Sequence, residues 1–241
     1  MTGADLSPSA AEHVLAFADD EHLIGQQHAE WIGVAPFLEE DLAFCSIAQD
    51  ELGHAASLYE LLGDADELAF RRAPDAWRSC HLVELPCADW ADALARHWLY
   101  DLAEIRRWEA LAGSSHPAVA ATVERARREE DYHRRHAGVL VVRMLADPRL
   151  PAAIDRLLPI ADALWEPAAG EAAALAEGVV TASSGELQPV WRADVEAVIG
   201  PVDWASRPRP AQRARTVRSE HFAPLLARIT EVFRLDPTAR W

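Results

Sequence analysis

Lysine is absent from the 241-residue sequence, so all 23 of its basic residues are arginine. This absence excludes enzymes that form a Schiff base through lysine and enzymes with a lysine nucleophile. Cysteine is scarce, with three residues and no Cys-x-x-Cys spacing. So few cysteines in a chain of this length are typical of reduced thiols in a cytosolic protein, and we expect a cytoplasmic location.

The sequence also lacks the features that direct a chain into or across a membrane. No apolar run approaches the roughly 18 residues that span a bilayer. The first ten residues contain neither the basic segment nor the apolar segment of a signal peptide. Positive charge is deficient as well, since the formal net charge is -16. Nucleic acids and anionic membranes are bound through basic patches, so we expect neither as a partner.

The composition that remains favours helices. Half of the residues are apolar, which is enough for a full core, and runs of β-branched residues are rare. Apolar periodicity predicts an all-α chain, with helices at about 7–31, 36–62, 90–112, 117–146, 151–178 (bent at Pro167), 189–199 and 216–234. Residues 181–189 are expected to form a loop, and the proline-rich residues 201–210 an extended segment.

The lengths of the connections predict how these helices pair. The first two helices are joined by a short break, as are the third and fourth, whereas 71–89 is long enough to cross the molecule. Short links give antiparallel neighbours, and a long link allows a crossover. We therefore expect a ferritin-like antiparallel four-helix bundle at about 8–146. A C-terminal helical extension at about 150–241 would complete a single domain of residues 1–241.

Each of the four bundle helices carries a carboxylate in the middle of its apolar stripe. These acids are Glu21, Glu51, Asp101 and Glu130, and two of them begin a Glu-x-x-His motif that ends at His54 and His133. The motif alone is a weak signal, but its place in a buried stripe is informative. Glu21 and Glu51 are 30 residues apart and Asp101 and Glu130 are 29 apart, which indicates two similar hairpins.

Four buried carboxylates facing one another need a compensating cation. Four carboxylates and two neutral imidazoles fit two divalent metal ions bridged by carboxylate, as in four-helix di-iron proteins. This ligand set suits iron, with manganese as the alternative, more than zinc or copper. The competing interpretation is that the acids lie on the surface of misjudged helices and the histidines are ordinary core residues.

Several neighbouring residues have alternative or supporting roles. Glu104 competes with Asp101 as the acid of the third helix, although the symmetry of the hairpins favours Asp101. Asp50 and Glu129 precede the two Glu-x-x-His motifs. Metal-bound imidazoles usually donate their other N–H to an acceptor, so we expect Asp50 to contact His133 and Glu129 to contact His54. Other histidines are interpreted as ordinary packing residues: His22, His97 and His136.

Four blocks of the sequence resemble the phenylacetyl-CoA epoxidase family, the ferritin-like PaaA and PaaC subunits of bacterial phenylacetate catabolism. The blocks lie at 19–55 (with AQDELGHA at its end), 81–101 (HLVELPCADWADALARHWLYD), 126–145 (ARREEDYHRRHAGVLVVRML) and 219–232 (SEHFAPLLARITEV). Their order and the last block are most similar to PaaC. The ligand pattern resembles that of the catalytic PaaA subunit, and its series falls on Glu21, Glu51, His54, Asp101, Glu130 and His133.

This resemblance implies a subunit of a multicomponent monooxygenase that uses dioxygen to epoxidise the ring of phenylacetyl-CoA. Electrons would come from NADPH through a separate flavin and iron–sulfur reductase. The implied partners are a homologous ferritin-like subunit and small accessory subunits, or a second copy of the chain. Two other functions stay open: a PaaC-type scaffold that binds a catalytic homologue, and a ferritin-like ferroxidase.

An aryl-CoA substrate is a polyanion, so this acidic chain needs a local cluster of arginines or a partner surface to bind it. One candidate cluster follows residue 206, although it fits an ordinary solvated surface equally well: Arg207, Arg209, Arg213, Arg215 and Arg218.

Overall fold

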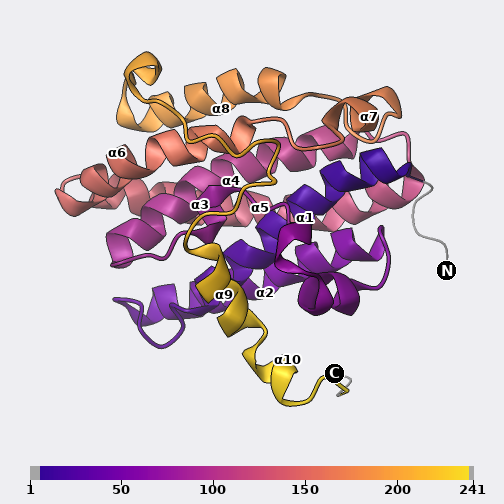
Figure 1. Cartoon of the computed structure of the whole chain (residues 1–241). Helices are drawn as coiled ribbons and strands as arrows, with labels where there is room; N and C mark the ends of the chain where they lie inside the picture. The colour runs from indigo at the N-terminus through magenta and orange to yellow at the C-terminus, as the bar shows by residue number, and fades with distance from the viewer. Residues whose placement is uncertain (1–5, 239–241) are drawn as a thin grey trace.

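The computed structural model describes residues 6–238, and every regular element within that range is a helix (Figure 1). This confirms the all-α class. Four long helices form the bundle: α1 (Pro8–Ala29), α2 (Leu38–Glu60), α4 (Trp90–Ala112) and α5 (Pro117–Met144). Their bounds agree with the predicted helices to within two residues at each end.

Local sequence signals explain where these helices begin. Ser7 caps α1, because its Oγ accepts a hydrogen bond from the backbone N–H of Ala10 at 3.1 Å. Asp89 caps α4 in the same way and accepts from the N–H of Asp92 at 3.0 Å. Pro117 occupies the first turn of α5, where its missing N–H costs nothing. The short links pair α1 with α2 and α4 with α5, and α2 also packs against α5.

The long connection between the hairpins is partly helical. It contains a π-helical turn η1 (Glu67–Arg71), a 3-10 turn η2 (Pro74–Ala76) and the single-turn helix α3 (His81–Glu84). α3 packs against α1, α4 and α6. The segment therefore crosses the molecule from one hairpin to the other, as its length predicts.

The C-terminal extension differs from its predicted form in three places. Its elements are α6 (Arg149–Asp162), η3 (Ala163–Trp165), α7 (Glu171–Ala176), α8 (Ser184–Ile199), η4 (Trp204–Ser206), α9 (Phe222–Ile229) and α10 (Glu231–Leu235). The single helix expected at 151–178 is wrong, because the chain breaks between α6 and α7. The loop expected at 181–189 is wrong from residue 184 onward, and the helix expected at 216–234 is two short helices.

Two local features account for the first two differences. Gly170 begins α7 with a φ of +82°, and a Cβ at this position would stand 1.8 Å from the carbonyl oxygen of Ser9. Only glycine fits there, so the chain turns where a continuous helix was expected. Ser183 and Glu186 form a capping box, in which each side chain binds the other residue's backbone N–H. This box starts α8 before Pro189.

Three helices of the extension, α6, α7 and α8, cover one side of the bundle. α6 and α8 pack on α4, and α7 packs on α1 (Figure 1). Trp191 of α8 is fully buried, and its Nε1 donates a hydrogen bond to the carbonyl of Leu99 at 3.1 Å. The extension is therefore part of the same packed core as α4.

A buried charge network fixes the segment that precedes α9 to α1. The fully buried Asp20 carboxylate accepts hydrogen bonds from the N–H of Cys80 at 2.6 Å, from Arg107 at 2.8 Å and from Arg215. Burial opposes ionisation of Asp20, but the two guanidinium groups and the Cys80 N–H hold its pKa below the usual range. The Asp20 carboxylate thus binds the guanidinium group of Arg215, a residue almost two hundred positions later in the sequence.

Backbone strain accompanies this anchor. Arg213, Ala214 and Arg215 have φ values of +48°, +54° and +62°, a left-handed conformation that costs about 1–2 kcal/mol per residue outside glycine. The Glu166 carboxylate supports the turn by accepting from the N–H groups of Gln212 at 2.8 Å and Ala214 at 2.7 Å. The buried contacts of Arg215 and Glu166 stabilise a conformation that the local sequence disfavours.

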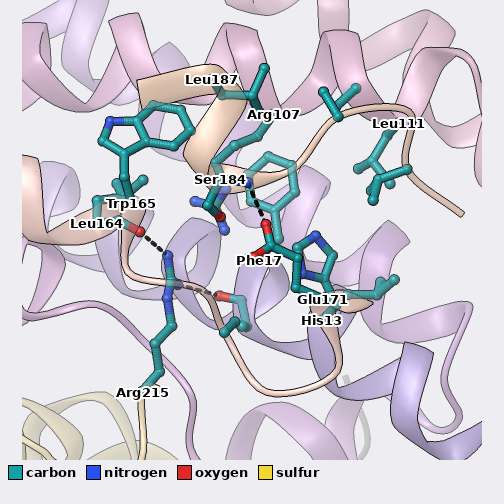
Figure 2. Close-up of a pocket in the computed structure, with 16 residues that line it drawn as sticks. His13, Phe17, Arg107, Leu111, Leu164, Trp165, Glu171, Ser184, Leu187 and Arg215 are labelled. Atoms are coloured by element: carbon teal, nitrogen blue, oxygen red, sulfur yellow. Dashed lines mark hydrogen bonds between the residues drawn. The ribbon is translucent and has the colours of Figure 1, made fainter. Parts of the chain in front are cut away.

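A small cavity lies beside Arg215, between α1, α4 and the extension (Figure 2). His13, Arg107 and Trp165 are among its lining residues, and its volume is about 30 Å³. Burial and the charges of Arg107 and Arg215 lower the pKa of His13 to about 3, which keeps the imidazole neutral. A space of this size holds about one water molecule, so it is not a site for an aryl-CoA.

We predict that Asp20→Asn destabilises the protein by about 3–5 kcal/mol, because it leaves two buried guanidinium groups without a counter-ion. Urea-induced unfolding at neutral pH measures this loss. Asp155→Asn is the matched control, since the same change there removes an exposed partner of Arg207 and should cost less than about 1 kcal/mol. Equal losses in the two variants would contradict the role of Asp20.

Candidate metal centre

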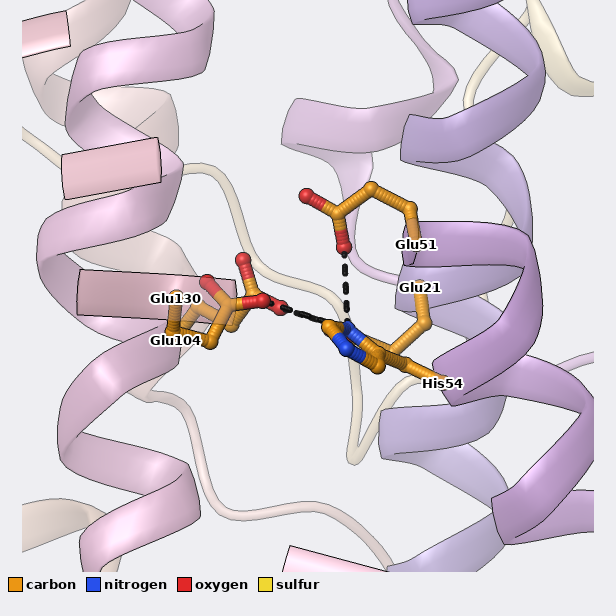
Figure 3. Close-up of side chains that lie close together, drawn as sticks. All are labelled: Glu21, Glu51, His54, Glu104 and Glu130. Atoms are coloured by element: carbon orange, nitrogen blue, oxygen red, sulfur yellow. Dashed lines mark ion pairs between the residues drawn. The ribbon is translucent and has the colours of Figure 1, made fainter. Parts of the chain in front are cut away.

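Four carboxylates and an imidazole converge in the middle of the bundle, one acid from each long helix (Figure 3). The residues are Glu21 of α1, Glu51 and His54 of α2, Glu104 of α4 and Glu130 of α5. One ligand atom of each lies within 4.8 Å of those of the others. All four acids are fully buried, and His54 nearly so. The competing interpretation, in which the acids lie on the surface, is therefore wrong for these four residues.

The position of this cluster follows from the distribution of apolar residues along the helices. On α1, Phe17 belongs to one apolar cluster and Leu23 to another, and Glu21 lies between them. On α5 the same change of cluster falls between Ala126 and Ala137. The acids thus form a polar layer between two apolar regions, both of which keep water away from it.

A glycine allows the first two helices to approach each other at this layer. Gly25 lies one turn beyond Glu21 on α1. A Cβ at this position would stand 3.0 Å from the Cβ of Glu51 and 3.1 Å from Cγ of Leu52, closer than side chains normally pack. The absence of a side chain at Gly25 therefore lets α2 bring Glu51 close to α1.

His54 lies at the centre of the acids. Its Nδ1 is 3.1 Å from Glu130 Oε1, 3.5 Å from Glu21 Oε2, 3.7 Å from Glu51 Oε2 and 3.9 Å from Glu104 Oε1. Figure 3 shows the carboxylates pointing toward this imidazole from both sides of the bundle. The arrangement directs one nitrogen lone pair and several carboxylate oxygens at a common point.

The second Glu-x-x-His motif completes the arrangement. His133 Nδ1 is 3.4 Å from Glu130 Oε1 and 3.5 Å from Glu51 Oε1, and the ring centroids of His133 and His54 are 6.3 Å apart. Glu51 and Glu130 therefore each contact both imidazoles. These two acids therefore lie between the two imidazoles.

Both crossed contacts expected for the outer acids are present. His54 Nε2 is 2.8 Å from Glu129 Oε2, and His133 Nε2 is 3.3 Å from Asp50 Oδ2. When Nε2 carries the proton and donates it to the outer acid, Nδ1 is left with a free lone pair. This pair of contacts orients Nδ1 of both rings toward the inner carboxylates.

Two hydrogen bonds to the inner acids were not predicted. Tyr100 donates its hydroxyl to Glu21 Oε1 at 2.6 Å, and Trp108 Nε1 donates to Glu104 Oε1 at 3.2 Å. Trp108 follows Glu104 by four residues, so the two side chains share a face of α4. The spacing of four residues is the signal in the sequence that could have predicted this contact.

Burial and mutual repulsion raise the pKa of two of the inner acids, Glu21 and Glu104. Burial and the negative charge of Glu51 raise the pKa of Glu21 to about 7. Burial and the charges of Glu130, Glu21 and Glu51 raise the pKa of Glu104 well above its usual range. Burial opposes protonation of His54, but the surrounding acids outweigh it and raise the imidazole pKa. The cluster therefore retains protons unless another cation replaces them.

Arginine does not provide that cation. Within residues 6–238, the ion-pair partners of the four inner acids are imidazoles. Buried atoms without a hydrogen-bond partner are both carboxylate oxygens of Glu51 and of Glu130, Oε2 of Glu21 and Glu104, and Nδ1 of both His54 and His133. Such atoms are rare in native structures and call for an explanation. Metal ions bound by oxygen and imidazole ligands fit this donor set, with iron or manganese favoured by the absence of thiolate.

Asp101 does not lie within the five-residue cluster, contrary to the preference from hairpin symmetry. Its Oδ1 is 2.9 Å from Nδ1 of the fully buried His97, one turn along α4 from Glu104. Burial raises the pKa of Asp101 to about 6, although the neighbouring His97 acts in the opposite direction. The geometry favours Glu104 as the α4 acid beside His54, whereas Asp101 contacts His97.

His97 is more than the ordinary packing residue that the sequence indicated. Besides Asp101, it contacts His28 of α1, with ring centroids 4.8 Å apart, and His136 of α5 at 5.9 Å. Nε2 of His136 in turn lies 2.9 Å from Oε2 of Glu40. His97 precedes Asp101 by four residues, which places both on the face of α4 that carries Glu104.

The arginine cluster near the end of the chain is largely neutralised. Arg207 pairs with Asp155, Arg209 with Asp162, Arg215 with Asp20 and Arg218 with Glu84. A CoA polyanion would have to compete with these carboxylates. The structure therefore gives no support to this cluster as the site for the CoA moiety.

The fold and the cluster together define the class of this protein: a ferritin-like helical bundle with a buried carboxylate–histidine centre. A family model described as phenylacetic acid catabolic protein matches residues 2–241, so the chain belongs to this family. The chain is 29% identical over 243 residues to the C subunit of 1,2-phenylacetyl-CoA epoxidase from Escherichia coli (strain K12), an alignment that covers 95% of this chain and 98% of that protein. None of the described helices has the length and apolar character of a membrane span.

Two near-isosteric variants distinguish the candidate acids of α4. Because burial and the neighbouring acids raise the pKa of Glu104 well above its usual range, we predict that Glu104→Gln leaves metal-free stability unchanged within about 1 kcal/mol. We also predict that it lowers the affinity for Fe(II) at least tenfold, since it removes an anionic ligand. Anaerobic iron titration and urea unfolding measure the two effects. If Asp101→Asn loses iron and Glu104→Gln keeps it, Asp101 is the ligand.

Proposed function

We propose that this chain is a subunit of a monooxygenase complex of the phenylacetyl-CoA epoxidase type, in aerobic phenylacetate catabolism, and that it carries its own di-iron site. Family membership and the similarity to an epoxidase subunit support the complex and the pathway. The observation that carries the di-iron site is the set of buried, unpartnered carboxylate and imidazole atoms without an arginine counter-ion among the described residues.

The residues that would hold two iron ions follow from their contacts. Glu51 and Glu130 would be central ligands, because each contacts both imidazoles. His54 and His133 would each bind one ion. Glu21 and one of the two candidate acids of α4, Glu104 or Asp101, would supply the remaining carboxylates. Manganese would suit the same ligands.

When bound, two iron ions would supply the redox chemistry that activates dioxygen, with electrons delivered from NADPH by a separate reductase. The protein contributes orientation, proton placement and exclusion of water. Glu129 and Asp50 hold the imidazoles in the tautomer that presents Nδ1 inward. Tyr100 keeps a proton directed at Oε1 of Glu21. The apolar clusters on both sides of the layer keep bulk water from the reacting groups.

A scaffold function without chemistry is the alternative, and one observation favours it. The arginines near the end of the chain are largely paired with acids, so a CoA thioester would be bound by a partner subunit. In that case, the cluster would be a polar layer held together by its own protons.

Iron content tests the metal site directly. We predict about two iron ions per chain in protein from iron-replete cells, and almost none in Glu51→Ala with unchanged helical circular dichroism. Glu51→Ala removes one of the two acids that contact both imidazoles, so binding of both ions would be weakened. Glu60→Ala is the control, because it removes an exposed acid from the same helix. Equal iron content in both variants would contradict the site.

Turnover by the assembled complex separates the catalytic function from the scaffold. We predict that the chain, combined with its homologous subunit, reductase, NADPH and dioxygen, supports addition of one oxygen atom to phenylacetyl-CoA. Loss of that product with Glu51→Ala, under conditions in which the variant still binds its partner, supports catalysis at this site. Undiminished product with the iron-free variant would assign the chain to the scaffold class.

A further inference from the structure

Arg96 of α4 is a buried arginine that lacks an acidic partner. The residue is 1% exposed, and no carboxylate within residues 6–238 forms an ion pair with it. Its Nη1 donates a hydrogen bond to the backbone carbonyl of Leu85, whereas its Nε and Nη2 are buried without a partner. A neutral carbonyl does not balance a guanidinium charge, and an unpaired charge is costly to bury. The surroundings of Arg96 therefore call for an anion.

The other well-buried arginines of the described residues show what Arg96 lacks. Four of them have side chains at most 13% exposed, and each forms an ion pair with a fully buried carboxylate: Arg72 with Asp19, Arg107 and Arg215 with Asp20, and Arg218 with Glu84. Long cationic side chains are rarely buried without such a pair. The chain has acids in excess, with a net charge of -16, yet it places none against Arg96.

Arg96 lines a pocket between α4, α6 and the residue that precedes α9. The volume of this pocket is about 190 Å³. Four apolar residues contribute to its wall: Leu85, Pro86, Leu157 and Ile160. An apolar cavity of about 150 Å³ holds benzene, so the pocket accommodates one ring with a short side group. Sites for drug-sized ligands begin at about 300 Å³, so the pocket is too small for a CoA moiety.

The other polar residues of this pocket do not neutralise Arg96. Among the described residues, its lining contains one acid, Asp92, and this acid pairs with Arg156. His221 also lines the pocket and cannot supply a negative charge. Burial raises the pKa of the Cys87 thiol, although Arg96 acts in the opposite direction, so Cys87 is not a thiolate at neutral pH. The anion that fits this pocket therefore comes from a ligand.

We propose that this pocket binds a small organic carboxylate of the arylacetate class, whose carboxylate pairs with Arg96. The ring of the ligand packs against Leu157 and Ile160, and its negative charge compensates the guanidinium. Phenylacetate is the appropriate probe, because the family is described by the catabolism of this acid. None of the residues that line the pocket belongs to the carboxylate–histidine cluster. The inference therefore does not depend on the proposed di-iron chemistry.

Calorimetric titration of the full chain with phenylacetate tests the pocket, and we expect one molecule to bind per chain. Phenylacetamide has nearly the same shape but no charge, and acetate has the charge but no ring. Each is expected to bind at least tenfold more weakly than phenylacetate. These comparisons use the unaltered protein, so they do not depend on the folding of a variant. The proposal is overturned if phenylacetate does not bind, if phenylacetamide binds as tightly, or if inorganic phosphate binds more tightly.

Two variants test the assigned residues. Arg96→Met is expected to raise the dissociation constant for phenylacetate at least tenfold, because it removes the cation and keeps a side chain of similar length. Arg143→Met is the matched control with unchanged affinity, since Arg143 is exposed on α5 and does not line the pocket. Ile160→Trp fills the pocket and keeps Arg96, and it is expected to weaken binding to the same extent. Helical circular dichroism confirms that each variant is folded. Undiminished affinity in a folded Arg96→Met or Ile160→Trp variant would overturn the assignment.

The Glu51→Ala variant separates this pocket from the metal centre. It is expected to lose iron but to bind phenylacetate with unchanged affinity, because Glu51 does not line the pocket. If this variant keeps its iron, the proposed di-iron site is wrong and the pocket is unaffected. If it no longer binds phenylacetate, the ligand lies at the metal centre and the present proposal is wrong.

Discussion

Repulsion between four carboxylates in a water-excluded layer is the constraint on which the rest of this structure depends. Each long helix contributes one of these acids, and no arginine in the described part of the chain balances them. The helices can pack at this level only if the negative charge is compensated by bound cations or by retained protons. The imidazoles of His54 and His133, held from outside by Glu129 and Asp50, are arranged for the first case. The same residues thus set both the stability of the bundle and its chemistry.

The C-terminal extension gives this bundle two unlike sides. On the side of α1 and α4, it adds apolar core and fixes its own end through Arg215 and Asp20, at the cost of a strained turn. On the side of α2 and α5, no described helix of the extension packs to a comparable extent. Asp50 and Glu129, which contact the imidazoles, are partly exposed there. The outer acids of the candidate metal centre therefore lie close to the surface of the chain.

The sequence alone was sufficient to predict the site residues whose charged side chains interrupt an apolar stripe. Glu21, Glu51 and Glu130 were predicted because a charged residue in a buried seam is costly and conspicuous. Hairpin symmetry favoured Asp101, whereas the structure places Glu104 in the cluster beside His54. Residues three apart share one face of a helix, so periodicity alone did not separate the two acids. Hydrogen bonds from Tyr100 and Trp108 were missed because aromatic rings are expected in an apolar stripe. The sequence does not show where the Tyr100 hydroxyl and the Trp108 N–H point.

The fold was also predicted well in one part of the chain and less well in another. The bundle helices have strong periodicity and clear caps, so their bounds were predicted closely. The extension was predicted less well because its breaks depend on tertiary contacts. The close approach of Gly170 to the backbone of Ser9 joins residues far apart in the sequence, and periodicity carries no information about it.

The division of the core into two apolar clusters has a consequence for how this protein unfolds. Along α1 and α5, the polar layer is the plane where hydrophobic cohesion is weakest. In the metal-free protein, the two halves are coupled there mainly through hydrogen bonds and shared protons, so one half can loosen before the other. Ions bound by ligands from all four helices would join the halves, and a ligand that binds only the folded state also raises its stability. Metal loading would then convert a stepwise melting transition into a single cooperative one.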